Sequence, residues 1–188
     1  MRNTLLVLIL SVALFFIGCA SSRATALAHQ AERQLASEDF IGAAASYQAA
    51  STLRPKHAAY LYNSLWSRYQ ANEYQEVITL SDQAYQRFST HSEFLLLKAK
   101  ALIATGAAED AFALYEEIFA KEEHPEALKE AVMDQAYALG YDSVATALAL
   151  ELISFRQYET QALSLLAEIY PDAWYEQALH YLSHQVAE

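Results

Sequence analysis

Apolar residues recur along most of this chain at helical spacing, and the pattern itself returns at a fixed longer period. Four segments align without a gap when the chain is shifted by this period; they begin at Glu38, Asn72, Gly106 and Gly140. Small or apolar residues then share two columns: Ala43, Val77, Ala111 and Ala145 form the first, and Ala50, Ala84, Ile118 and Leu152 form the second. A fixed period of about 34 residues predicts a repeated unit of two helices.

A second apolar stripe precedes these columns in each unit. Its residues, four apart, fall on one face of a helix: Ala31, Leu65, Ala99 and Met133, followed by Leu35, Tyr69, Ile103 and Tyr137. Gly106 and Gly140 fall at the turns between paired helices, where a left-handed residue is often needed. The repeat register ends near residue 159. Beyond it we predict helices over 160–169 and 172–186, with Asp172 as the N-cap of the second.

This pattern resembles the tetratricopeptide repeat (TPR), a helix–turn–helix unit of about 34 residues. The best copy carries Phe40, Ala43, Tyr47, Ala50 and Pro55. The resemblance implies an all-α, TPR-like solenoid of helical hairpins. The four repeats would span residues 24–57, 58–91, 92–125 and 126–159. A C-terminal helical cap would follow over residues 160–188.

The chain departs from the family in the first helix of each repeat. Repeat position seven, where the family has a large residue, holds Gln30, Ser64 and Lys98. The apolar stripe lies beside this position. We therefore expect the buried face of these helices to be rotated relative to the family pattern.

The N-terminus carries a separate apolar segment. Arg2 is followed by an apolar run over 5–17 whose 13 residues are too few for a membrane-spanning helix and typical of an export signal. The alternative is an uncleaved anchor, because no charged residue lies between Arg2 and Arg23.

The end of this segment, Phe16-Ile17-Gly18-Cys19, resembles a bacterial lipoprotein signal. The resemblance implies a signal peptide over 1–18, cleavage before Cys19, diacylglycerylation of its thiol and a lipidated tether over 19–23. The resemblance also implies a location: the residue after the lipidated cysteine is Ala20 and not aspartate, which in this family implies the outer membrane, facing the periplasm. Cys19 is the only cysteine, so an intramolecular disulfide and a cysteine zinc cluster are both excluded.

Composition narrows the class of partner. The chain of 188 residues has 12 Lys and Arg against 23 Asp and Glu, a formal charge of −11, which disfavours nucleic-acid binding. No glycine-flanked serine elbow and no phosphate-binding GxxxxGK[ST] loop occurs, so we expect neither an enzyme nor a bound cofactor.

His180 and His184, with Glu176 one turn earlier, have metal-ligand spacing. A solvated helix with ordinary histidines is the more frequent outcome, so no metal site is assigned.

The resemblance to TPR arrays implies a ligand groove lined by the first helices. The groove residues that it places in this chain are Tyr62, Asn63, Trp66, Tyr69, Leu96, Lys100, Glu130, Asp134 and Tyr137. Tyr62, Trp66 and Tyr69 form one aromatic stripe, and aromatic anchors dominate protein interfaces. The competing interpretation is that the stripe belongs to the core, especially at Tyr69.

These observations predict a lipid-anchored, periplasm-facing scaffold that binds a protein partner in a complex of the bacterial envelope. The alternative is an envelope lipoprotein that binds a small ligand or a metal, for example as an accessory of solute uptake.

Overall fold

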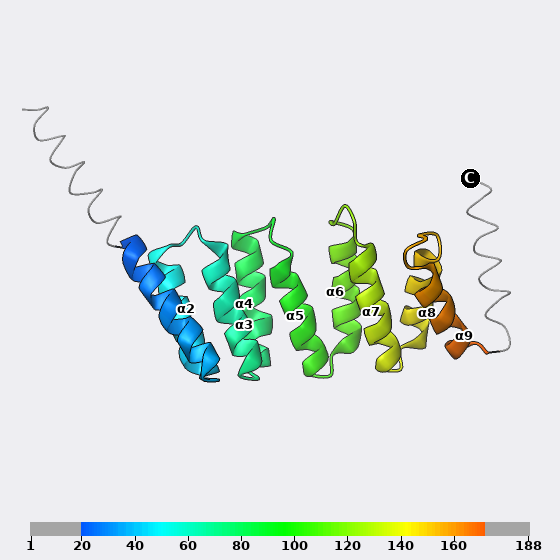
Figure 1. Cartoon of the computed structure of the whole chain (residues 1–188), viewed down its shortest axis with the longest axis horizontal. Helices are drawn as coiled ribbons and strands as arrows, with labels where there is room; N and C mark the ends of the chain where they lie inside the picture. Colours follow the sequence, from blue (N-terminus) through cyan, green and yellow to red (C-terminus); the bar gives the residue numbers. More distant parts are fainter. Residues whose placement is uncertain (1–19, 172–188) are drawn as a thin grey trace, which may run out of the picture. The chain divides into compact units, whose positions relative to one another are not determined.

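A computed structural model describes residues 20–171, and all regular structure within that range is α-helical (Figure 1). The prediction of an all-α protein is thus confirmed for these residues. The chain divides into two compact units, residues 1–114 (unit 1) and 115–188 (unit 2). The predicted helix over 172–186 lies outside the described residues.

Unit 1 contains a first helix, described over residues 20–36, followed by four complete helices. These are α2 (Phe40–Leu53), α3 (Ala58–Gln70), α4 (Tyr74–Arg87) and α5 (Glu93–Ala104). The unit boundary falls within α6 (Ala108–Phe119). In unit 2 the described helices are α7 (Glu126–Ala138), α8 (Asp142–Leu152) and α9 (Glu159–Ile169).

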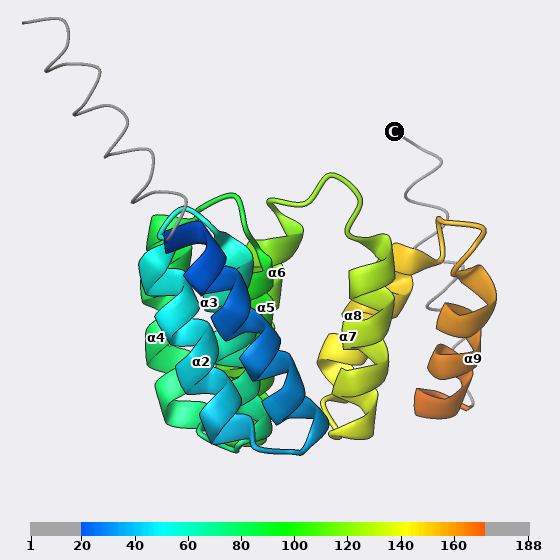
Figure 2. The same cartoon turned by 60° about the vertical axis from the view of Figure 1, so that its left-hand side comes forward.

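Consecutive helices pack together within each unit. In unit 1, α2 packs on α3, α3 on α4 and α4 on α5, and α3 also contacts α5. In unit 2, α7 packs on α8 and α8 on α9. The turned view in Figure 2 shows the first helix (dark blue) lying alongside α2.

The helices follow the period found in the sequence. Helices α2, α4, α6 and α8 begin at Phe40, Tyr74, Ala108 and Asp142, a constant interval that equals the sequence period. Pro125 is the N-cap of α7, before the first turn, where its missing backbone donor breaks no helical hydrogen bond. The other helices follow the period less exactly, since α3, α5, α7 and α9 begin at Ala58, Glu93, Glu126 and Glu159.

The same period governs the turns. Gly106 and Gly140 have φ of 83° and 79°, which confirms that these positions need a left-handed residue. Glu38 and Asn72 occupy the equivalent positions and have φ of 61° and 62°. A Cβ on Gly106 or Gly140 would meet no atom within 4 Å, so backbone conformation rather than crowding favours glycine there.

The predicted columns form the core. Every residue of the two second-helix columns is at most 2% exposed, and Ala31, Leu65, Ala99 and Met133 are 0% exposed. The next stripe is less buried, since Leu35, Tyr69 and Ile103 are half-buried and Tyr137 is exposed. Complete burial is thus confirmed for the first of the two stripes. Complete burial of a leucine such as Leu65 stabilises the fold by about 1.5–3 kcal/mol.

Candidate functional site

Three aromatic side chains of α3 form the candidate site of unit 1; we call Tyr62, Trp66 and Tyr69 the α3 aromatic face. The Trp66 ring stacks on Tyr69, with centroids 5.6 Å apart and planes at 15°. Tyr69 meets Tyr74 edge to face at 5.3 Å, and Tyr62 meets Phe94 edge to face at 6.0 Å. The face is continuous with the turn into α4 and with the start of α5.

The α3 aromatic face is half core and half surface. Its three rings are half-buried and pack against the cluster that contains Leu65 and Phe94. The two interpretations of the stripe therefore both hold in part: one side of each ring stabilises the fold, while the remainder of its surface stays accessible.

Helix α5 adds a cation to this face. The Nζ atom of Lys100 lies 5.8 Å from the centroid of the Trp66 ring, within the range of a cation–π interaction. Lys100 is exposed, and none of the ion pairs within residues 20–171 includes it. Leu96, one helical turn earlier on α5, is half-buried. The structure thus brings Trp66 and Lys100 together from two helices.

Asn63 is engaged with the preceding helix. Its side chain hydrogen-bonds the hydroxyl of Tyr47, a residue of α2 that is 4% exposed. Burial and the nearby Glu32 carboxylate raise the pKa of Tyr47, and this hydrogen bond partly opposes the rise. Asn63 therefore joins α3 to α2, in addition to lying next to the aromatic face in sequence.

The remaining predicted groove residues lie on α7 in unit 2, where α9 engages two of them. Gln161 of α9 donates a hydrogen bond to Asp134 at 2.7 Å. The Tyr137 hydroxyl hydrogen-bonds Glu168, which together with partial desolvation raises the pKa of Tyr137. Glu130 is half-buried. Because α9 supplies partners for Asp134 and Tyr137, the open part of the predicted groove is the α3 aromatic face with Lys100.

The α3 aromatic face is neutral and lies between a cation, Lys100 near Trp66, and an anion, Glu93 near Tyr62. Burial, with a smaller contribution from Glu93, raises the pKa of Tyr62. Burial, with a smaller contribution from Tyr74, raises the pKa of Tyr69. Both hydroxyls are therefore neutral at physiological pH. They can exchange hydrogen bonds with a partner, while Lys100 supplies a positive charge.

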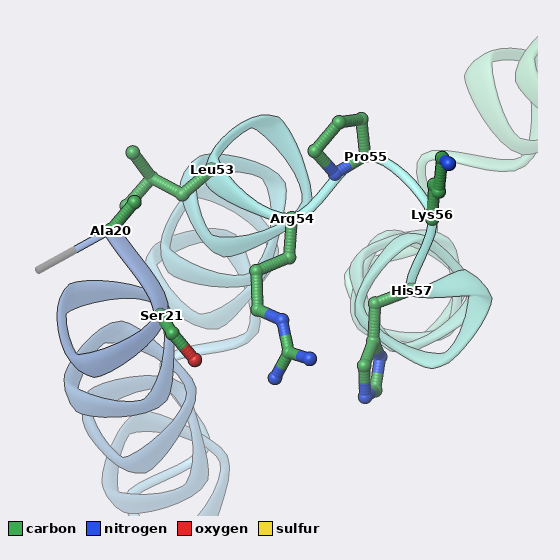
Figure 3. A pocket seen from close by; sticks show the side chains of 7 residues that line it. All are labelled: Ala20, Ser21, Leu53, Arg54, Pro55, Lys56 and His57. Atoms are coloured by element: carbon green, nitrogen blue, oxygen red, sulfur yellow. The ribbon is translucent and has the colours of Figure 1, made fainter. Parts of the chain in front are cut away.

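Sequence reasoning missed a hollow of about 420 Å³ at one end of unit 1. Its lining comes from the start of the first helix and from the loop between α2 and α3: Ala20, Ser21, Leu53, Arg54, Pro55, Lys56 and His57 (Figure 3). His57 stacks on Tyr60 with centroids 4.2 Å apart. The available signal was the pair Arg54 and Lys56 around Pro55, but their proximity to Ala20 depends on helix packing.

The other predicted sites fall outside the described part of the chain. Cys19, Glu176, His180 and His184 all lie beyond residues 20–171. Within those residues, no group of three histidine, cysteine, aspartate or glutamate side chains is arranged to hold a metal ion. None of the helices described there is both long and apolar enough to cross a membrane.

The fold of residues 20–171 defines an all-α class of consecutively packed helices. Comparison with known proteins adds no family, since no protein-family model and no curated protein matches the chain. Its function is therefore argued from its own residues.

Proposed function

We propose that this protein is a lipid-anchored, TPR-like scaffold of the bacterial envelope that binds a protein partner through the α3 aromatic face and Lys100. The observation that carries the proposal is the contact between Lys100 and Trp66, which presents a charged group and an aromatic surface together on the outside of unit 1. Tryptophan and tyrosine are enriched in protein-binding hot spots.

The repeat assignment is supported by two features that share one period. The first is the start of the second helices, at Phe40, Tyr74, Ala108 and Asp142. The other is the left-handed backbone at each turn before them. TPR-like units with this spacing would stack as a solenoid, and residues 160–188 would provide its C-terminal cap.

The anchor is supported by the sequence around Cys19. Two or three acyl chains on one residue hold a protein firmly on a membrane, because each buried methylene contributes about 0.8 kcal/mol. Residues 20–23, assigned to the tether, are already helical. An acylated Cys19 would therefore hold the first helix directly at the bilayer surface, on the periplasmic side of the outer membrane. A membrane-bound assembly is then the natural partner.

The partner is best sought by in-cell cross-linking followed by isolation of the membrane fraction. The variant to compare with wild type is Lys100→Glu, because Lys100 is exposed and its charge reversal spares the core. Arg33→Glu is the matched control: it makes the same charge change at another exposed position of unit 1. Circular dichroism checks that both variants fold.

We expect one envelope protein to be captured by wild type and by Arg33→Glu, and capture to fall at least about tenfold with Lys100→Glu. Equal capture by all three proteins would show that this face is not the binding site. Recovery of the protein in the soluble fraction, with an unmodified Cys19 thiol by mass spectrometry, would contradict the anchor instead.

A further inference from the structure

Four cations gather at the end of unit 1 that adjoins Cys19 in sequence; we call Arg23, Arg54, Lys56 and Arg87 the basic end. Arg54 and Lys56 flank Pro55 in the loop between α2 and α3, and this loop shares the 420 Å³ hollow with Ala20. Arg87, the last residue of α4, donates a hydrogen bond to the Pro55 carbonyl. Arg23 lies near the start of the first helix, one turn after Ala20.

The charges of the basic end are available to a ligand. All four cations are exposed, and none belongs to an ion pair within residues 20–171. Elsewhere in unit 1, by contrast, Arg68 pairs with Glu73 and Glu76, and Lys98 pairs with Asp82.

The acids of unit 1 are concentrated at its other end. Glu38 and Asp39 precede α2, Glu73 and Glu76 lie at the start of α4, and Glu109 and Asp110 lie in the first turn of α6. The 14 residues of α2 separate the two ends by about 21 Å, more than twice the Debye length of about 8 Å at physiological salt. At the basic end, Glu93 pairs with His91 at 2.6 Å. The net acidity of the chain therefore does not cancel the positive potential of this end.

The hollow itself has the composition of a headgroup site. Ala20, Leu53 and Pro55 supply apolar surface, and Figure 3 shows the Arg54 side chain between Ser21 and His57. A guanidinium group binds phosphate oxygens in a bidentate manner, and the serine hydroxyl can donate a further hydrogen bond. Ala20 directly follows Cys19, so a lipid anchored there places this hollow at the bilayer surface.

We infer that the basic end is a second membrane contact, which binds the headgroups of anionic phospholipids and fixes the orientation of unit 1 on the bilayer. This inference rests on the proposed lipid anchor at Cys19. Acyl chains alone leave a protein free to tilt. Contact of the basic end with anionic headgroups holds the acidic end away from the membrane and keeps the α3 aromatic face accessible to a partner.

The test uses the full acylated protein, purified from cells and reconstituted into vesicles of phosphatidylcholine alone or mixed with phosphatidylglycerol. Mass spectrometry first establishes the acyl group on Cys19. Because that cysteine is the only one and its thiol is then blocked, an introduced cysteine takes a fluorophore at one position. Ala59→Cys reports on the basic end and Ala36→Cys on the acidic end; both positions are exposed. Spin-labelled lipid headgroups quench a fluorophore that lies close to them.

We expect the Ala59→Cys label to be quenched at least about fivefold more strongly when phosphatidylglycerol is present, since each cation near an anionic surface changes partition by roughly this factor. The Ala36→Cys label should not respond. Arg54→Glu/Lys56→Glu should abolish the difference, whereas Arg33→Glu/Arg156→Glu, with the same change of net charge, should retain it.

Three outcomes would overturn the inference. An acylated protein whose Ala59→Cys label ignores phosphatidylglycerol would refute the headgroup contact and leave the proposed scaffold intact. Equal loss of quenching in both double variants would show that the lipid dependence reflects the net charge of the protein and not a specific contact at the basic end. An unmodified Cys19 would remove the anchor, and this inference with it.

Discussion

The ammonium group of Lys100 lies 5.8 Å from the centre of the Trp66 ring, and that ring also stacks on Tyr69 at 5.6 Å. This relationship links α5 to α3 at the surface of unit 1. The two kinds of side chain have different roles on this surface. The rings pack against the core, whereas the exposed lysine does not.

Substitutions at this pair should therefore differ in their effect on stability. Lys100→Met keeps the aliphatic stem and removes only the charge, so we expect the free energy of unfolding to fall by about 0.5–1 kcal/mol. Trp66→Ala removes a ring packed against the core cluster, and we expect a loss of about 2 kcal/mol or more. Urea unfolding monitored by circular dichroism measures both values.

Arg33→Met is the control for removing an exposed charge of unit 1, and it should change stability by less than about 0.5 kcal/mol. A Trp66→Ala variant as stable as wild type would show that the ring is purely a surface group. It would also make Trp66→Ala usable as a binding variant, which the packing now argues against.

The left-handed turns give a second prediction. Glu38 holds φ of 61° at a position where the later repeats have glycine, so Glu38→Gly should stabilise the protein by up to about 1 kcal/mol. Asn72→Gly should gain less, because asparagine tolerates this conformation and its side chain accepts a hydrogen bond from Tyr74 at 2.5 Å. Gly106→Ala should cost about 1 kcal/mol.

Thermal and urea unfolding of the three variants measure these changes. Ser37→Gly supplies the control, since Ser37 is adjacent and has no positive φ. It should destabilise the protein, because it removes the hydrogen bonds from the Ser37 hydroxyl to the carbonyls of Arg33 and Gln34 and increases the freedom of the unfolded chain. If Glu38→Gly were to destabilise as Ser37→Gly does, backbone strain at this turn would be refuted.

The helices and their buried columns could be predicted from the sequence, because the spacing of apolar residues along a single helix shows which of its faces is buried. The same spacing could not predict which group lies opposite a given side chain. Asn63 meets Tyr47, and Asp134 meets Gln161, only because of how neighbouring helices pack. The hollow beside Ala20 was missed for the same reason: one wall comes from the first helix and the other from the end of α2 and the loop that follows it, which are far apart in the chain.

The polar residues at repeat position seven have a physical explanation in the structure. Ser64, which is fully buried, donates a hydrogen bond to the carbonyl of Ala44 at 2.9 Å. Lys98 reaches Asp82 with distances of 2.8 and 2.9 Å to its two oxygens. Both side chains thus bond to the helix before their own. Polar pairing replaces apolar contact at this position of the second and third repeats.

Two buried serines test this explanation. Ser64→Ala leaves the Ala44 carbonyl without its side-chain donor, and we expect a loss of about 1 kcal/mol in the free energy of unfolding. Ser81 is also 0% exposed, but its hydroxyl has no partner within the described residues. Ser81→Ala should therefore be neutral or stabilising. Equal losses in the two variants would contradict the assignment of the Ser64 hydrogen bond.

The raised pKa of Tyr62 predicts that the free energy of unfolding changes at alkaline pH. Burial, and secondarily the Glu93 carboxylate, raise its pKa in the folded state above the ordinary value of 10.0. The folded state therefore holds this proton at pH values where the unfolded state has begun to release it. Stability from this source is complete below about pH 10 and is lost as pH rises through the higher folded pKa.

Urea unfolding at a series of pH values up to about 11 would measure this loss in wild type and in Tyr62→Phe. We expect the variant, which cannot ionise at this position, to lose less stability over that interval. Some loss should remain, because the pKa values of Tyr47 and Tyr69 are raised as well. Glu93→Gln should give an intermediate curve, since it removes the second cause and leaves the burial of the ring unchanged. Parallel curves for wild type and Tyr62→Phe would mean that the Tyr62 hydroxyl is solvated in the folded state, and that this end of the α3 aromatic face is more open than its packing against Phe94 implies.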